Sequence, residues 1–467
     1  MRFKSYFLKL LPVISCLAGF LSQATNAWAA SYYAAPNGSG TSCTVESPCA
    51  LNSGLGKLVP GDTLYLRGGT YNQIVSFSES GTSGSRITIS GYPGETAIID
   101  GYYSIPDGCY DFLVTIFGSY VTFRDIRVQN SYGSGIATGG ETTGIQFINV
   151  ILDYTGETGL VLGGSYNLAD HVTVTRNGQR YGSGCGTWGS ALCTVGSNNT
   201  IQNSLTYDNI GEGLNAYSSS KNSIIQDNVS YNNRSVALYL DSSSGAIVRR
   251  NLVYYSPGWN LSSARCLTIG AETGQASNLT IVNNFLMGGF VNLETDSNLT
   301  QLTNVTIANN TIVNARGDLS SGYNMGVYIR PDLTSFSNSV FTNNIVVEEA
   351  SGRIPISVPS SHPGLTFSHN NWNKTPAVSA QGTGDVISDS KIAKTGSTGP
   401  GQLTGEYFKI LADSPARDNG STIFSVTDDF FGKNRPVGIY PDMGGYEYGG
   451  EAESDVLKPP ANLRITN

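Results

Sequence analysis

Short apolar strands recur along most of the chain and alternate with polar turns. Ten of them share a six-residue pattern and follow one another at about 22 to 26 residues, widening to about 33 where a loop is inserted. Strands this short cannot bury a hydrophobic face alone, so the repeat predicts an all-β solenoid of about ten or more stacked rungs. The units begin at Phe123, Phe147, Leu168, Ile201, Ile225, Val248, Ile281, Ile307, Phe341 and Phe367.

Asparagine recurs at the fourth position of the later units. On stacked rungs, each side-chain amide is expected to hydrogen-bond its neighbour and the turn backbone, in the left-handed conformation that asparagine tolerates. His171 occupies the same position of an earlier unit, which favours a turn or stacking role over a catalytic one. The predicted ladder comprises Asn228, Asn251, Asn284, Asn310, Asn344 and Asn370.

A second short strand follows a loop in each later unit and alternates with period two. One alternate set is apolar and is expected to face inward, which gives three strands per turn around an apolar interior. This set comprises Leu214, Ala216, Leu238, Leu240, Leu267, Ile269, Val291, Leu293, Val327 and Ile329.

The composition agrees with one solenoid domain. Of 467 residues, 56 are glycine and only 13% are charged, while 39% are hydrophobic. Repeated turns account for the glycine, and a backbone paired between rungs accounts for the scarcity of charge. The formal net charge of -8 argues against nucleic-acid binding, which needs a cationic surface. We expect a monomer.

The first 29 residues have the pattern of a signal peptide. Arg2, Lys4 and Lys9 precede an apolar run over 10–21, and a small-residue cleavage pattern ends at Ala29. A lipoprotein signal at Cys16 is the alternative. Cleavage would change the formal charge from -8 to -11. We expect a secreted, periplasmic or extracellular protein without a membrane span, a solenoid domain over 30–449 and a disordered tail over 450–467.

Six cysteines remain after the expected cleavage, and export permits disulfides. Cys43 and Cys49 flank one short loop, and Cys185 and Cys193 flank another, so the sequence predicts these two pairs. Cys109 with Cys266 is a further possibility. The spacings do not match a zinc site.

Short motifs mark both ends of the expected solenoid, at residues 33–40, 60–71, 81–84, 87–92, 98–101, 414–420 and 441–448. They resemble the pectin-lyase-like family of secreted right-handed parallel β-helix proteins, which includes bacterial pectate and alginate lyases. The resemblance implies a single-stranded right-handed parallel β-helix and a polysaccharide substrate. Catalytic motifs of mannuronan epimerases and polygalacturonases are missing from the sequence, so no family catalytic residue is carried over.

The outward positions of the second strands predict a groove across several rungs, which lie about 4.8 Å apart. Asp241 and Glu294 are expected to face each other across about 10 Å over the small Gly270. The first outward column is Asn215, Tyr239, Thr268, Asn292 and Tyr328, and the second is Tyr217, Asp241, Gly270, Glu294 and Arg330. Beyond them lie Ser243, Glu272, Asp296 and Asp332.

The carboxylates Asp241, Glu272, Glu294 and Asp296 are predicted to bind Ca²⁺, because neighbouring like charges favour a cation and all-oxygen ligands suit calcium. A lyase acting on a uronate must neutralise the sugar carboxylate and remove the C5 proton. Arg234 and Arg330 are the candidates for this step, with Tyr239 as a possible proton donor. Candidate sugar-binding residues are Asn215, Tyr217, Arg265, Asn292 and Tyr328.

Three functions remain open. The first is a lyase that cleaves an acidic polysaccharide by calcium-assisted β-elimination. The second is a glycoside hydrolase using paired carboxylates in the same groove. The third is a carbohydrate-binding solenoid whose outward charges are only a solvated face. Glu157 and Glu212 lie in loops before strands and are interpreted as turn residues rather than catalytic groups.

Overall fold

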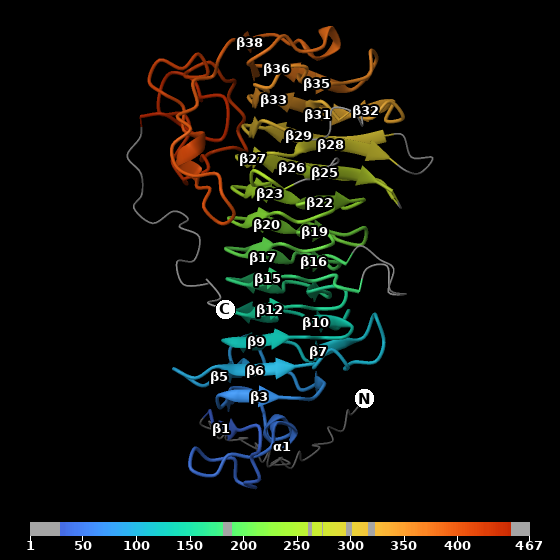
Figure 1. Ribbon diagram of the computed structural model, residues 1–467, viewed down its shortest axis with the longest axis vertical. Helices are drawn as coiled ribbons and strands as arrows, with labels where there is room; N and C mark the ends of the chain where they lie inside the picture. The colour runs from blue at the N-terminus through green and yellow to red at the C-terminus, as the bar shows by residue number, and fades with distance from the viewer. Residues whose placement is uncertain are drawn as a thin grey trace, which may run out of the picture.

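The computed structural model describes residues 29–180, 189–259, 264–272, 274–295, 301–315 and 323–449. The chain winds through three parallel sheets, here called A, B and C, and Figure 1 shows the rungs stacked from the N-terminal to the C-terminal end. This confirms the predicted all-β solenoid with three strands per turn. The expected signal peptide and C-terminal tail lie outside the described residues.

Sheet A contains 14 strands, and its β32 pairs with β29 beside the main path. Its strands are β1 (Ser31–Ala34), β2 (Thr63–Leu66), β5 (Ile87–Gly91), β8 (Val121–Arg124), β11 (Gln146–Ile148), β14 (Leu168–Asp170), β17 (Thr200–Gln202), β20 (Ile224–Gln226), β23 (Ile247–Arg249), β26 (Ser277–Val282), β29 (Gln301–Ala308), β32 (Ser335–Ser337), β33 (Ser339–Thr342) and β36 (Leu365–Ser368).

Sheet B contains 13 strands. They are β3 (Gly69–Tyr71), β6 (Ala97–Asp100), β9 (Ile126–Gln129), β12 (Ile151–Asp153), β15 (Thr173–Thr175), β18 (Leu205–Tyr207), β21 (Val229–Tyr231), β24 (Leu252–Tyr254), β27 (Phe285–Met287), β30 (Thr311–Val313), β34 (Ile345–Val347), β37 (Asn371–Trp372) and β38 (Val386–Ile387).

Sheet C contains 11 strands and carries the candidate site. They are β4 (Val75–Phe77), β7 (Phe112–Ile116), β10 (Ser134–Thr138), β13 (Leu160–Leu162), β16 (Leu192–Thr194), β19 (Leu214–Ala216), β22 (Leu238–Asp241), β25 (Arg265–Ala271), β28 (Phe290–Thr295), β31 (Met325–Ile329) and β35 (Ile354–Ser357). The described helices are short: α1 (Leu51–Leu55) and the 3-10 turns η2 (Val378–Ala380) and η3 (Gly405–Phe408). In the described part, no helix is long and apolar enough to cross a membrane.

The interior is filled by the residues that the alternation predicts. All ten inward positions, from Leu214 to Ile329, belong to the main core and are at most 1% exposed. Parallel strands are buried in this way because each short strand packs against those of the other sheets within its rung.

The asparagine ladder is confirmed between sheets A and B. Each Nδ2 donates to the Oδ1 of the next rung, at 3.0 Å from Asn251 to Asn284 and 2.9 Å from Asn284 to Asn310. The left-handed turn residue, however, directly precedes the ladder asparagine, as at Asn283 (φ 56°) before Asn284. His171 occupies this preceding position (φ 54°), so it is a turn residue one place before the ladder.

Cys43 and Cys49 form the predicted disulfide. The predicted Cys185–Cys193 pair is wrong, because Cys193 is a buried thiol held inside β16, while Cys185 lies outside the described residues. Cys109 is disulfide-bonded. It does not pair with Cys266, whose buried thiol donates to the carbonyl oxygens of Val253 and Met287.

The segment after β38 folds back along sheet B beside the last rungs (Figure 1). Its Phe408 and Phe430 stack on Phe285 of β27, with ring centroids 4.5 and 4.1 Å apart. This packing covers the outer face of the later strands of sheet B with apolar side chains. The outer face of sheet C lies on a different side of each rung and does not contribute to this cluster.

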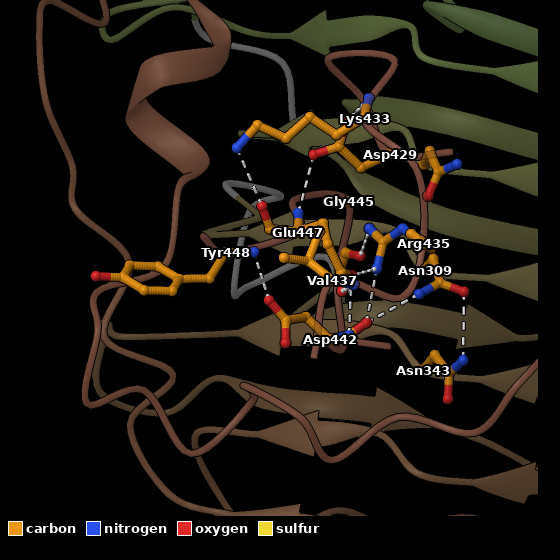
Figure 2. Close-up of polar contacts among 12 residues, drawn as sticks. Asn309, Asn343, Asp429, Lys433, Arg435, Val437, Asp442, Gly445, Glu447 and Tyr448 are labelled. Carbon is orange, nitrogen blue, oxygen red and sulfur yellow. Dashed lines mark hydrogen bonds and ion pairs between the residues drawn. The ribbon is translucent and has the colours of Figure 1, made fainter. Parts of the chain in front are cut away.

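A buried polar network holds the C-terminal segment in shape (Figure 2). The Arg435 guanidinium donates to Glu447 at 2.9 Å, and both side chains are at most 2% exposed. Asp442 accepts from two backbone amides, and burial beside Glu447 raises its pKa to about 6. Asn309 of the solenoid donates to the Asp442 carbonyl oxygen at 3.1 Å, which ties the network to the rungs.

Candidate functional site

The outer face of sheet C carries two columns of polar residues in the predicted register. Asn215, Tyr239, Thr268, Asn292 and Tyr328 pair in that order across β19, β22, β25, β28 and β31. In the second column, Asp241 pairs with Gly270 and Gly270 with Glu294. Parallel pairing without a register change at these positions places the side chains above one another.

Most of these outward side chains are buried rather than solvated. Asp241 is 3% exposed and Glu294 is 5% exposed, so the interpretation of these two charges as a solvated face is wrong. The physical reason is local packing. A Cβ added at Gly270 would meet the Tyr239 hydroxyl at 2.7 Å, so the tyrosine ring lies over the glycine that separates the two carboxylates.

The first column also presents buried polar atoms that have no hydrogen-bond partner among the residues that the structure describes. They are Oδ1 of Asn215, Oγ1 of Thr268 and Nδ2 of Asn292, on three different rungs. Buried polar groups are nearly always satisfied in folded proteins, and exceptions are frequent at functional sites. This run of amide and hydroxyl groups could bind the hydroxyl groups of a sugar chain.

Glu212 has the most informative environment of the site. Its side chain is buried at the start of β19 and accepts hydrogen bonds from Ser190 Oγ at 2.6 Å and from Asn215 Nδ2. Burial, together with the nearby charges of Asp241 and Glu272, raises the pKa of Glu212 to about 7. A carboxyl group with this pKa can donate or accept a proton near neutral pH.

Asp241 and Tyr239 complete the titratable cluster on β22. Burial is the main cause of the raised pKa of Asp241, opposed by a hydrogen bond from Ser242, and the charge of Glu294 raises it further. The Tyr239 hydroxyl donates to Glu272, and burial together with this bond raises its pKa well above the ordinary value. Tyr239 is therefore protonated at neutral pH and is a donor rather than a base.

Glu294 is held by two arginines from the neighbouring rungs. Arg330 Nη1 lies 3.2 Å from one carboxylate oxygen, and Arg265 Nη1 lies 3.5 Å from the other. Arg330 also forms an ion pair with Asp332 at 2.7 Å. A guanidinium between two carboxylates keeps its proton, so Arg330 can bind an anion but is a poor base.

The predicted calcium ligands do not converge in the described part of the chain. Among those residues, no group of three or more His, Cys, Asp or Glu side chains could hold a metal ion. Glu294 is engaged by arginines and Glu272 by Tyr239, while Asp296 lies outside the described residues. Two of the four predicted ligands thus have protein partners in the described part of the chain, and calcium binding stays a prediction.

The other predicted site residues, Tyr217, Tyr328 and Arg234, are less buried than the carboxylates. Tyr217 lies in the second column and is 44% exposed, and burial of the rest of its ring raises its pKa. Tyr328 is half-buried against Phe290 and Tyr323, in edge-to-face contact with both rings. Arg234 is exposed in the loop before β22, outside the buried cluster.

Sequence reasoning undervalued Glu212. A glutamate between two glycines resembles a turn residue, and only the fold turns its carboxyl group toward Ser190. Glu157 is also buried, but it accepts from Ser134 and Thr158, and no contact to Asp241 or Glu272 is found in the described part. The sequence feature that could have identified Glu212 as a site residue is its short separation along the chain from the outward Asn215.

Comparisons with known proteins agree with this architecture. Residues 32–246 match the family model described as a Pel9A-like right-handed β-helix region. Pectate lyase L of Paenibacillus polymyxa is 25% identical over 222 residues, which cover 42% of this chain and 47% of that protein. The chain therefore spans about half the length of this relative.

Two solved structures resemble nearly the whole solenoid. Pectate lyase Pel9A has 16% identity and a TM-score of 0.50, covering 90% of this chain and 97% of its own. XylC in complex with xylose has 11% identity and a TM-score of 0.62, covering 90% and 99%. At these identities the structures establish the fold alone. The chain thus has the fold of a right-handed parallel β-helix protein, its residues 32–246 match the Pel9A-like β-helix region, and part of its sequence is similar to that of a pectate lyase.

Proposed function

We propose that this protein is a polysaccharide lyase that cleaves a uronate-containing chain bound along the outer face of sheet C. The observation that carries the proposal is the buried Glu212 carboxyl group, whose pKa of about 7 suits proton transfer beside the unsatisfied polar atoms of the first column. Sequence similarity to a pectate lyase over 222 residues supports elimination as the reaction.

In β-elimination the C5–H and C4–O bonds break and a C4–C5 double bond forms. We assign the C5 proton to the Asp241 carboxylate, and we assign Glu212 as the acid that protonates the leaving oxygen. Arg265 and Arg330, on either side of Glu294, are the cationic groups available to the sugar carboxylate. Tyr239 donates a hydrogen bond and orients Glu272.

Calcium assistance remains a prediction from the sequence, and no step is assigned to the ion because Glu294 and Glu272 already have protein partners. Export from the cell, a monomeric state and a role for Arg234 likewise remain predictions.

A glycoside hydrolase is the second candidate, and the balance of charge favours it. Among the described residues the cluster holds four carboxyl groups, Glu212, Asp241, Glu272 and Glu294, against the guanidinium groups of Arg265 and Arg330. A surplus of carboxyl groups disfavours an anionic chain, and two carboxyl groups with different pKa values could serve as acid and base in hydrolysis.

The experiment is an assay on polygalacturonate, alginate and xylan that records both ultraviolet absorbance of unsaturated ends and total reducing ends. Elimination produces both signals, whereas hydrolysis produces reducing ends without absorbance. Absence of both signals on all three polymers, with binding retained, would favour the carbohydrate-binding alternative.

A further inference from the structure

A hollow lies on the outer face of sheet C, near the N-terminal end of the solenoid. Its volume is about 550 Å³, and its lining includes Tyr110, Phe117, Thr115 and Gly139. Tyr110 is 59% exposed and Phe117 is 56% exposed. Two large aromatic side chains with this exposure beside one hollow form an apolar patch that could bind a ligand.

Phe117 belongs to the same outward column as the candidate catalytic carboxylates. Ile116 pairs with Thr138, Leu162 with Thr194 and Thr194 with Ala216. The residue that directly follows each of these inward positions points outward. These outward residues form one column, made of Phe117, Gly139, Gly163, Val195, Tyr217 and Asp241.

Backbone hydrogen bonds between neighbouring strands of sheet C continue to these positions. Gly139 N donates to the Ile116 oxygen at 2.9 Å, Val195 N to the Leu162 oxygen at 3.0 Å, and Tyr217 N to the Thr194 oxygen at 3.0 Å. Five rung steps of about 4.8 Å separate Phe117 from Asp241, a distance of about 24 Å.

Few side chains project from the column between Phe117 and Tyr217. Gly139 and Gly163 present no side chain, and Val195 is half-buried. A Cβ added at Gly139 would lie 3.1 Å from Cδ1 of Phe117, so the phenyl ring rests beside bare backbone. This part of the column therefore has an aromatic ring at each end, Phe117 and Tyr217, and two glycines without side chains between them.

We propose that Phe117 and Tyr110 form a remote sugar-binding subsite that holds the distal part of the polysaccharide chain whose cleavage is assigned to Glu212 and Asp241. Aromatic faces stack on the C–H faces of sugar rings. The neighbouring Asp107 and Asp111 are exposed, so their carboxylates can accept hydrogen bonds from sugar hydroxyl groups. Continuity of the outward column from Phe117 to Asp241 identifies the occupant as the same chain. The inference rests on the proposed function for its substrate.

The test measures binding and turnover separately, using Phe117→Ala and Tyr110→Ala. Phe424→Ala is the matched control, because Phe424 is 94% exposed on the C-terminal segment. Long-chain polygalacturonate, alginate and xylan serve as probes in titration calorimetry, and a trisaccharide of whichever polymer binds serves as the short probe.

Each of the two variants should weaken binding of the long polymer about three- to tenfold, the size of one aromatic stacking contact. Binding and turnover of the trisaccharide should not change, because it cannot span about 24 Å from the carboxylates. Equal affinity of Phe117→Ala and Phe424→Ala for the long polymer would overturn the subsite. So would equal losses on long and short probes.

Failure of the proposed function has a different outcome. If the wild-type protein binds a polymer but cleaves none, the comparison of Phe117→Ala with Phe424→Ala still decides the subsite. Absence of binding by the wild-type protein to all three polymers would overturn both the subsite and the lyase proposal.

Discussion

Asp241 and Glu294 lie two rungs apart in one column of sheet C, with only Gly270 between them. Their side chains are both buried, and the charge of Glu294 contributes to the raised pKa of Asp241. In the described contacts, Arg265 and Arg330 neutralise the negative charge of Glu294 but form no ion pair with Asp241. The two carboxyl groups therefore have different electrostatic environments, which is the condition for separate roles in catalysis.

Replacing Glu212 with glutamine should reduce kcat/KM by about 100-fold or more, because an amide cannot transfer the proton. In the wild-type protein, kcat/KM should fall as the pH rises above about 7, since the acid must be protonated and its pKa is about 7. This alkaline limb should disappear in the variant.

Glu157→Gln is the control for this prediction, because Glu157 is equally buried in a loop before a strand but is bonded to Ser134. It should retain most of the activity. Full activity of Glu212→Gln, or an alkaline limb that persists in it, would exclude Glu212 as the acid.

Chelation with EDTA should leave most of the activity and the thermal unfolding midpoint unchanged. The reason is that guanidinium groups of Arg265 and Arg330 already neutralise Glu294, one of the four predicted calcium ligands. Turnover and thermal unfolding are measured before and after EDTA treatment, and again after addition of CaCl₂. Loss of turnover with EDTA and its recovery with CaCl₂, but not MgCl₂, would instead support the calcium site predicted from the sequence.

Asn284→Ala should destabilise the protein by about 2–4 kcal/mol, measured from urea unfolding. The Asn284 Oδ1 accepts from both the backbone N and the Nδ2 of Asn251, so truncation leaves buried donors unsatisfied. Asn419→Ala, at an exposed position of the C-terminal segment, should cost less than about 1 kcal/mol. Similar unfolding midpoints for the two variants would contradict a stabilising role of the ladder.

Arg435→Leu should destabilise the C-terminal segment by about 3–5 kcal/mol, because Glu447 and Asp442 would stay buried without their cationic partner. The segment covers Phe285 of sheet B, so its release should also increase the binding of a hydrophobic dye.

Arg417→Leu provides the matched control. Arg417 pairs with Asp418 at 3.4 Å at the surface, with side chains 43% and 34% exposed, and an exposed pair contributes less than about 1 kcal/mol. Equal stabilities of the two leucine variants would show that the buried network does not hold the segment.

The repeat made the solenoid and its interior predictable. A residue such as Leu240 faces inward because period-two alternation and the stacking of units leave it no other apolar environment. The column of Asp241, Gly270 and Glu294 followed from the same register. The Cys185–Cys193 pairing failed because loop length was used without the strand register that fixes Cys193 in β16.

The sequence by itself determined the rungs, the asparagine ladder and the order of residues in each outward column, because these depend on local periodicity and on stacking of similar units. Only the tertiary structure decided burial and charge pairing. Tyr239 covers Gly270, two arginines converge on Glu294, and Glu212 turns inward to Ser190. Such contacts depend on side-chain directions and on the distances between rungs, and these determine the raised pKa of Glu212.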